Sequence, residues 1–230
     1  MTTISNALQA VRERIARAAV QCGRAPASIA LLAVTKTCGP EAIRAAYAEG
    51  QRAFGESYAQ EALPKIAALA DLDLEWHCIG PLQSNKTKPI AEHFAWVHGV
   101  DRAKIAQRLS EQRPPELPPL NICLQVNVSG ESSKSGVAPT QLAALVRMVA
   151  ALPRLKLRGL MAIPAPTEDM AQQRAAFHVV RELFEELNRQ GFALDTLSMG
   201  MSHDLEAAIQ EGATIVRVGS AIFGERRKPL

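Results

Sequence analysis

Lys36 is the side chain in this sequence whose position most clearly points to covalent chemistry. It follows the apolar run Ile29–Val34, in the segment Val34-Thr35-Lys36-Thr37. A primary amine at the end of a buried strand is partly desolvated, which lowers the pKa of its ammonium group and favours imine formation with a carbonyl compound. The alternative is a surface lysine that merely closes a strand, and position alone does not separate the two.

Two glycine–serine segments near the end of the sequence could bind a phosphate group. Ser198-Met199-Gly200-Met201-Ser202 and Arg217-Val218-Gly219-Ser220 each end a short apolar run and precede a helical pattern. At such turns free backbone N–H groups face an anion, glycine permits a close approach and a serine hydroxyl adds a donor. We therefore predict a phosphate site where these two segments meet, with the Gly219-Ser220 turn as part of it. Two ordinary helix caps are the alternative explanation.

Arg217 is unusual because it lies within a strand-like run, Ile215–Val218, two residues before Gly219. Residues two apart in a strand point to the same face. A buried guanidinium needs an acceptor, which is either a ring atom of a ligand held at the turn or a buried carboxylate. An imine-forming lysine, a phosphate site and an arginine between them fit a phosphorylated aldehyde with a basic ring nitrogen. Pyridoxal 5'-phosphate (PLP) is that molecule.

Other residues are weaker candidates for ligand contacts. Ser57 follows a strand-like run and could either reach a ligand or cap the next helix. His77 lies inside another such run, where a histidine is more often a buried structural residue than a catalyst. Met201 lies within the first glycine–serine segment. The polar loop Ser129–Gly136 could be a lid over the site or an ordinary solvated loop.

The elements that position these residues alternate between strands and helices. Their apolar runs lack clean alternation, which is typical of parallel strands buried on both faces. The predicted strands are Ile29–Val34, Arg52–Phe54, Trp76–Ile79, Trp96–Val100, Ile122–Val128, Leu157–Ile163, Thr196–Met199 and Ile215–Val218. The predicted helices are the first ~20 residues, Glu41–Ala48, Ala59–Ala70, Arg102–Gln112, Thr140–Ala150, Met170–Gln190 and a helix from about Asp204, by their apolar spacing. This pattern predicts an α/β protein, a (β/α)8 TIM barrel with an extra N-terminal helix, whose chemistry lies where strands end. A doubly wound open sheet is the main alternative, because strand count cannot prove closure.

Composition narrows the class of protein. With 230 residues and no convincing linker, we expect one domain over residues 1–230, with 225–230 as a frayed tail. The net charge of +3 is too small to indicate nucleic-acid binding. The four cysteines are scattered without zinc-type spacing, so we expect no metal. We find neither a signal peptide nor the ~20 consecutive apolar residues of a membrane span, and expect a cytoplasmic protein.

The chain resembles the pyridoxal phosphate homeostasis protein family from about Ile29 to Arg226. The resemblance is carried, in order, by LLAVTKT, FGESYAQE, WHCIGPLQSNK, VNVSGESSKSG, LRGLMAIP, LSMGMSHDLEAAI and VRVGSAIFGER. It implies a fold-type III PLP barrel, like the N-terminal domain of alanine racemase, with the Schiff base on Lys36. It implies phosphate contacts at Ser202 and Gly219-Ser220, with Arg217 at the pyridine nitrogen. One departure is Ser57, where the family usually has asparagine.

We expect a PLP carrier rather than an enzyme, and assign no catalytic residue. An arginine stays charged and can only donate, so the ring nitrogen facing Arg217 would stay unprotonated and carbanion stabilisation would be weak. Racemases of this fold take a second acid–base group from a C-terminal domain across a dimer. The sequence stops at Leu230, so we expect no such domain, and we expect Tyr47 and Tyr58 to be packing or surface residues.

The resemblance also implies a biological role: intracellular PLP (vitamin B6) homeostasis and, indirectly, amino-acid homeostasis. We expect a monomer, with PLP-dependent apoenzymes as candidate recipients. Two enzymatic alternatives stay open. A low-activity PLP-dependent amino-acid racemase would exchange the substrate α-proton with solvent. A cofactor-free aldolase would use Lys36 to attack a phosphorylated sugar, and would carry no bound chromophore.

Overall fold

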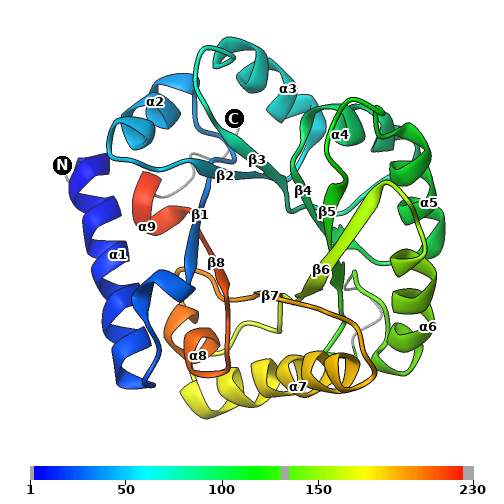
Figure 1. Ribbon diagram of the computed structural model, residues 1–230. Helices are drawn as coiled ribbons and strands as arrows, with labels where there is room; N and C mark the ends of the chain where they lie inside the picture. The colour runs from blue at the N-terminus through cyan, green and yellow to red at the C-terminus, as the bar shows by residue number, and fades with distance from the viewer. Residues whose placement is uncertain (1–2, 131–134, 225–230) are drawn as a thin grey trace.

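Eight parallel strands close into a barrel in chain order in the computed structural model, which describes residues 3–130 and 135–224 (Figure 1). The strands are β1 Ala30–Val34, β2 Ala53–Glu56, β3 Glu75–Cys78, β4 Trp96–Val100, β5 Leu120–Gln125, β6 Leu155–Met161, β7 Thr196–Ser198 and β8 Ile215–Val218. β1 and β8 complete the ring, with Leu32 paired opposite Arg217. The predicted barrel is confirmed, and the open sheet is excluded by this closure. The predicted tail, 225–230, lies outside the described residues.

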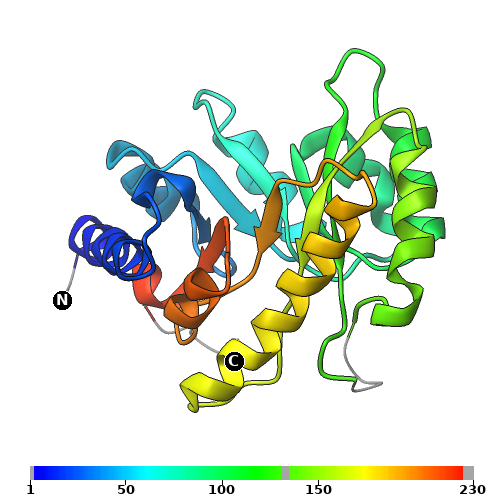
Figure 2. The same ribbon diagram turned by 60° about the horizontal axis from the view of Figure 1, so that its bottom comes forward.

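Helices surround the ring of strands on its outside (Figures 1 and 2). They are α1 Ile4–Gln21, η1 Pro26–Ser28, α2 Pro40–Ala48, α3 Ala59–Ala68, η2 Ser84–Lys86, α4 Thr87–His93, α5 Ala103–Gln112, α6 Pro139–Ala150, α7 Met170–Arg189, α8 Leu205–Gln210 and α9 Ser220–Phe223. None of the helices within the described ranges has the length and apolarity needed to cross a bilayer.

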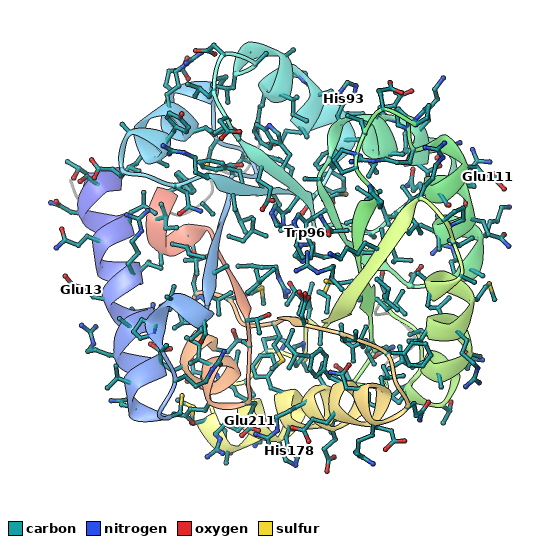
Figure 3. The ribbon with its side chains drawn as sticks, viewed as in Figure 1. Glu13, His93, Trp96, Glu111, His178 and Glu211 are labelled. Carbon is teal, nitrogen blue, oxygen red and sulfur yellow. The ribbon has the colours of Figure 1, made fainter. Side chains whose placement is uncertain are left out.

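The apolar core has two parts because successive side chains of a strand point to opposite faces. On β1, Ala33 packs outward into the large cluster between strands and helices, whereas Leu32 and Val34 belong to a small cluster inside the barrel. On β4, Val97 packs outward and Trp96 lies within the ring of strands (Figure 3). The interior is not wholly apolar, since several polar side chains are also buried there: His77, His98, Ser198 and Arg217.

The extra helix α1 connects the beginning of the chain to its last quarter. It packs against α2, α8 and α9. Arg14 donates to both carboxylate oxygens of Glu206, at 2.9 and 3.0 Å, and its Nη2 donates to the backbone oxygen of Ser202 at 3.2 Å. Helix α1 therefore helps to hold the loop that follows β7, which contains one of the predicted phosphate contacts.

Candidate functional site

Lys36 lies at the mouth of the barrel, two residues beyond β1, between two residues that are firmly held. Thr35 is fully buried. Thr37 has a φ of 65°, in the left-handed region that β-branched residues rarely adopt. Its N–H donates to a carboxylate oxygen of Glu61 on α3, which holds this uncommon conformation in place. The backbone on both sides of Lys36 is thus fixed by the surrounding structure.

A buried ionic cluster, formed by Lys65, Glu56 and Glu61, lies beside Lys36. Lys65 Nζ donates to Glu56 Oε1, Glu61 Oε1 and the backbone oxygen of Thr35, each at 2.8 Å. Burial raises the pKa of Glu56, while the bonds from Lys65 and Thr35 act in the opposite direction. The sequence interpretation missed this cluster. The sequence carries only two weak signals of it, a glutamate at the end of a strand and the i,i+4 spacing of Glu61 and Lys65, which is equally common on exposed helix faces.

The two predicted phosphate turns meet at the mouth of the barrel. Ser220 Oγ lies 3.3 Å from Ser202 Oγ, within hydrogen-bond distance. Gly200 has a φ of 93°, and a Cβ there would lie 2.6 Å from the Ala208 Cβ. A Cβ on Gly219 would lie 3.1 Å from the Val34 backbone oxygen. Both glycines therefore allow backbone approaches that a larger residue would hinder.

Arg217 points into the barrel and is only 4% exposed. Its Nη1 donates to Ser198 Oγ at 2.7 Å and also to the Ser198 backbone oxygen, and its Nη2 donates to the Ala162 backbone oxygen at 2.9 Å. Burial lowers the pKa of Arg217 to about 10, partly opposed by Asp204, so the guanidinium stays charged near neutral pH. Within the described ranges Arg217 forms no ion pair with a carboxylate, which removes the structural salt bridge as its explanation.

One cavity of about 240 Å³ brings most of the predicted site residues together. Its lining is Val34, Lys36, Ile79, Ile163, Met201, Ser202, His203, Arg217, Gly219 and Ser220. The amine, the two turns and the guanidinium therefore face the same space. His203, which the sequence interpretation did not single out, joins them because it follows Ser202 in the loop.

Two predicted candidates lie outside the lining of this cavity. Ser57 is 8% exposed and is packed so closely that a Cβ on Gly80 would lie 2.1 Å from its backbone oxygen. His77 points into the barrel interior, where it contacts Glu75 and His98. Of the loop Ser129–Gly136, residues 131–134 lie outside the described residues. Ser135 lines a neighbouring cavity, which shares Ile79 and Ile163 with the first.

A metal site is not apparent in the described ranges. No three His, Cys, Asp or Glu side chains gather there in a group that could hold an ion. The groups that line the cavity supply an amine, a guanidinium, an imidazole, hydroxyls and backbone amides. Such a set binds an anion and can form an imine with a carbonyl compound.

Comparison with known proteins defines first the class of this barrel. The family model described as alanine racemase, N-terminal domain, matches residues 7–227. The alanine racemase of Corynebacterium glutamicum superposes with a TM-score of 0.67 at 17% identity, over 94% of this chain and 60% of that one. At this identity the likeness concerns the fold alone. The molecule is an alanine racemase-type barrel.

Closer relatives then identify the family. A protein of Pseudomonas aeruginosa named pyridoxal phosphate homeostasis protein is 64% identical over 226 residues, covering 98% of this chain and 97% of the relative. A protein of the same name from Escherichia coli K12 is 52% identical, with 98% of each chain covered. PipY of Synechococcus elongatus PCC7942, solved with PLP bound, is 39% identical with a TM-score of 0.85, over 96% of this chain and 100% of that one. The chain belongs to the pyridoxal phosphate homeostasis protein family, as its motifs indicate.

Proposed function

We propose that this protein binds PLP as a Schiff base on Lys36 and serves as a carrier in intracellular PLP homeostasis, without substantial catalysis. The observation that carries the proposal is the single cavity shared by Lys36, Arg217 and the two phosphate turns. The names of the relatives and the PLP-bound structure of PipY support it.

Each end of the cavity fits a different part of this cofactor. Lys36 supplies the amine that condenses with the aldehyde carbon, with release of one water. Ser202 and the Gly219-Ser220 turn offer hydroxyls and backbone N–H groups to the phosphate, at a point where glycine leaves room for it. Arg217, a buried cation whose hydrogen-bond partners among the described residues are neutral, would donate to the pyridine nitrogen. When bound, PLP supplies an electron-withdrawing ring.

The carrier role follows from what Arg217 does to this ring. Because the guanidinium stays charged and only donates, it would keep the ring nitrogen of a bound PLP unprotonated and so weaken the ring as an electron sink. Racemisation also needs a second acid–base group. Of the two tyrosines, Tyr58 is 59% exposed and Tyr47 packs under Arg52, with 3.7 Å from Cζ to the ring centroid. Neither lines the cavity, so a second acid–base role there would fall to His203. PLP-dependent apoenzymes would be the recipients of the carried cofactor.

The visible absorption spectrum of the purified protein tests the cofactor assignment. We expect a yellow band that borohydride bleaches, present in the wild type and absent from Lys36→Ala. Lys88→Ala is the matched control, because this exposed lysine on α4 lies away from the cavity. A protein that stays colourless after incubation with PLP would overturn the assignment and favour the cofactor-free aldolase.

A second measurement separates carrier from racemase. The PLP-loaded protein is incubated with L-alanine in deuterium oxide, and loss of the α-proton signal is followed by NMR. We expect exchange no faster than that caused by free PLP at the same concentration. Exchange well above that background, and lost in Lys36→Ala, would establish the racemase alternative.

A further inference from the structure

A row of hydrogen-bonded polar side chains runs through the interior of the barrel. It starts at Glu75, at the beginning of β3 and so at the end of the barrel opposite the cavity. His77 Nε2 lies 2.8 Å from Glu75 Oε1, and His77 Nδ1 lies 2.9 Å from His98 Nε2. His98 Nδ1 lies 2.7 Å from Ser198 Oγ, which accepts from Arg217. We call these five residues the lumen chain: Glu75, His77, His98, Ser198 and Arg217.

The two ends of the lumen chain set the direction of its hydrogen bonds. Arg217 can only donate, so Ser198 Oγ accepts from it and its own hydroxyl hydrogen is available for His98 Nδ1. His98 then carries its proton on Nε2 and donates to His77 Nδ1. His77 in turn carries its proton on Nε2 and donates to the Glu75 carboxylate. Every bond thus points from the cavity towards Glu75.

The opposite direction is chemically excluded. It would leave a bare His77 Nε2 facing Glu75, which requires either a protonated carboxyl or a doubly protonated imidazole. The bond from His77 lowers the pKa of Glu75, so that carboxyl stays ionised at neutral pH. Burial lowers the pKa of both His77 and His98, so both imidazoles stay neutral.

Packing holds the lumen chain in one geometry. The His77 ring stacks on Trp96, with 5.4 Å between centroids and 5° between planes. Arg158 covers Trp96, its Cζ 4.6 Å from the ring centroid. Of the five members only Glu75 reaches solvent, since its side chain is half exposed and the other four are at most 4% exposed. Besides the members of the chain, the charged or titratable groups that act on it are Arg158, near Glu75, and Asp204 and Cys123, near Arg217.

We propose that Glu75, His77 and His98 are positioning residues that aim Arg217 at the ring-nitrogen end of the cofactor. The inference rests on the proposed PLP site and assigns a role to the far end of the barrel. With His98 Nδ1 as its acceptor, the Ser198 hydroxyl turns its hydrogen away from Arg217 and presents a lone pair to Nη1, beside the backbone oxygens of Ser198 and Ala162 that also accept from the guanidinium. His98 is itself oriented by a chain that ends on a carboxylate. The recognition of the nitrogen therefore depends on residues that do not line the cavity.

The decisive test compares two ligands that differ only at the nitrogen: PLP and 1-deazapyridoxal phosphate. Wild type should bind PLP more tightly by roughly tenfold or more, as expected for a hydrogen bond to a charged group. His98→Phe should lose most of this preference, and Glu75→Gln, which keeps an acceptor for His77, should reduce it by roughly threefold. Asp73→Asn is the matched control: it removes an exposed charge two residues from Glu75 and should leave the preference unchanged.

The outcomes separate this inference from the function on which it rests. General damage to the barrel would weaken both ligands equally and leave their ratio intact, which would overturn the positioning role. If wild type bound neither ligand, the PLP assignment itself would fail. NMR of the ligand-free wild type with ¹⁵N-labelled histidine gives an independent readout. At pH 8 both should be neutral Nε2–H imidazoles, and an Nδ1–H or charged form of either at that pH would refute the direction of the chain.

Discussion

Replacement of Lys65 by methionine is the sharpest test of how the structure holds Lys36. Lys65 makes three hydrogen bonds of 2.8 Å and its side chain is 8% exposed, while its partner Glu56 is fully buried. Methionine fills a similar volume but leaves the Glu56 carboxylate without its cation. One oxygen of that carboxylate, Oε2, already has no hydrogen-bond partner.

The expected loss of stability is large. Removing one partner of a buried ion pair costs about 3–5 kcal/mol, because an uncompensated charge stays buried. For a domain of this size that corresponds to a fall in Tm of roughly 6–20 °C. The loss should also depend on pH. Burial holds the folded-state pKa of Glu56 above its unfolded value, and loss of Lys65 raises it further. A carboxyl of this kind favours folding below its unfolded pKa and loses that contribution as pH rises through the folded pKa. The Lys65→Met deficit should therefore be largest near pH 8 and shrink towards pH 5.

Thermal and guanidinium unfolding of wild type, Lys65→Met and Lys65→Met/Glu56→Gln measure this effect. The double variant should recover most of the stability at pH 8, because it removes the buried charge. Lys88→Met is the matched control, since Lys88 and Glu92 form an exposed pair at 3.8 Å and should matter by less than about 0.5 kcal/mol. A Lys65→Met deficit that is equal at pH 5 and pH 8, and is not relieved by Glu56→Gln, would refute the reasoning.

Three further predictions concern the phosphate loop, the strand packing and the thiols. Arg14→Ala should weaken PLP by roughly two- to tenfold while leaving pyridoxal, which lacks the phosphate, unchanged, because Arg14 holds the Ser202 backbone; titration of both ligands checks this. Gly159→Ala should cost about 3 kcal/mol or more on guanidinium unfolding, because its Cβ would lie 1.7 Å from a backbone oxygen of β7. Cys38 should react with a thiol reagent in the native protein and be protected by PLP, since it lines a cavity that also contains Lys36. The two thiols whose pKa burial raises to about 12 should react only after unfolding: Cys78 and Cys123.

Each of these three predictions has a control variant or a result that would contradict it. Arg17→Ala removes an exposed arginine of α1 and should leave the affinity for both ligands unchanged. Equal weakening of PLP and pyridoxal by Arg14→Ala would contradict the idea that Arg14 holds the phosphate loop through the Ser202 backbone. Gly23→Ala places a Cβ in open space at a φ of 69° and should cost only about 1 kcal/mol. Rapid labelling of Cys123 in the native protein would contradict its burial inside the barrel.

The barrel was predictable because its evidence is local. Each strand is a short apolar run and each helix has its own periodicity, so the alternation is visible without knowledge of any contact. The exact bounds of the strands were less predictable from the sequence. The sequence predicts strands at Ile122–Val128 and Leu157–Ile163, but β5 is Leu120–Gln125 and β6 is Leu155–Met161. These strands begin where Leu120 pairs with Leu155, and apolar residues continue past their ends into the mouth of the barrel.

The residues of the candidate site also fall into two groups: those that the sequence could reveal and those that it could not. Lys36, Ser202 and Arg217 could be singled out because residue type and strand position together indicate a role. Lys65 and His98 could not, because each acquires its role from partners distant in the sequence. Lys65 resembles any helical lysine until its contact with Thr35 is known. His98 is one histidine within an apolar run until His77 and Ser198 are seen on either side of it.

The contact between Arg14 and the Ser202 loop has a consequence for the timing of biosynthesis. The two residues are 188 positions apart, and β1 cannot complete the ring until β8 has been made. At the usual pace of translation, roughly 10–40 s separate the appearance of Arg14 from that of Ser202. Throughout that interval Lys36 has been synthesised, but the phosphate turns, Arg217 and the anchor for α1 have not. A nascent or prematurely terminated chain should therefore withdraw little cofactor from the cell, and retention of PLP begins only with a finished molecule.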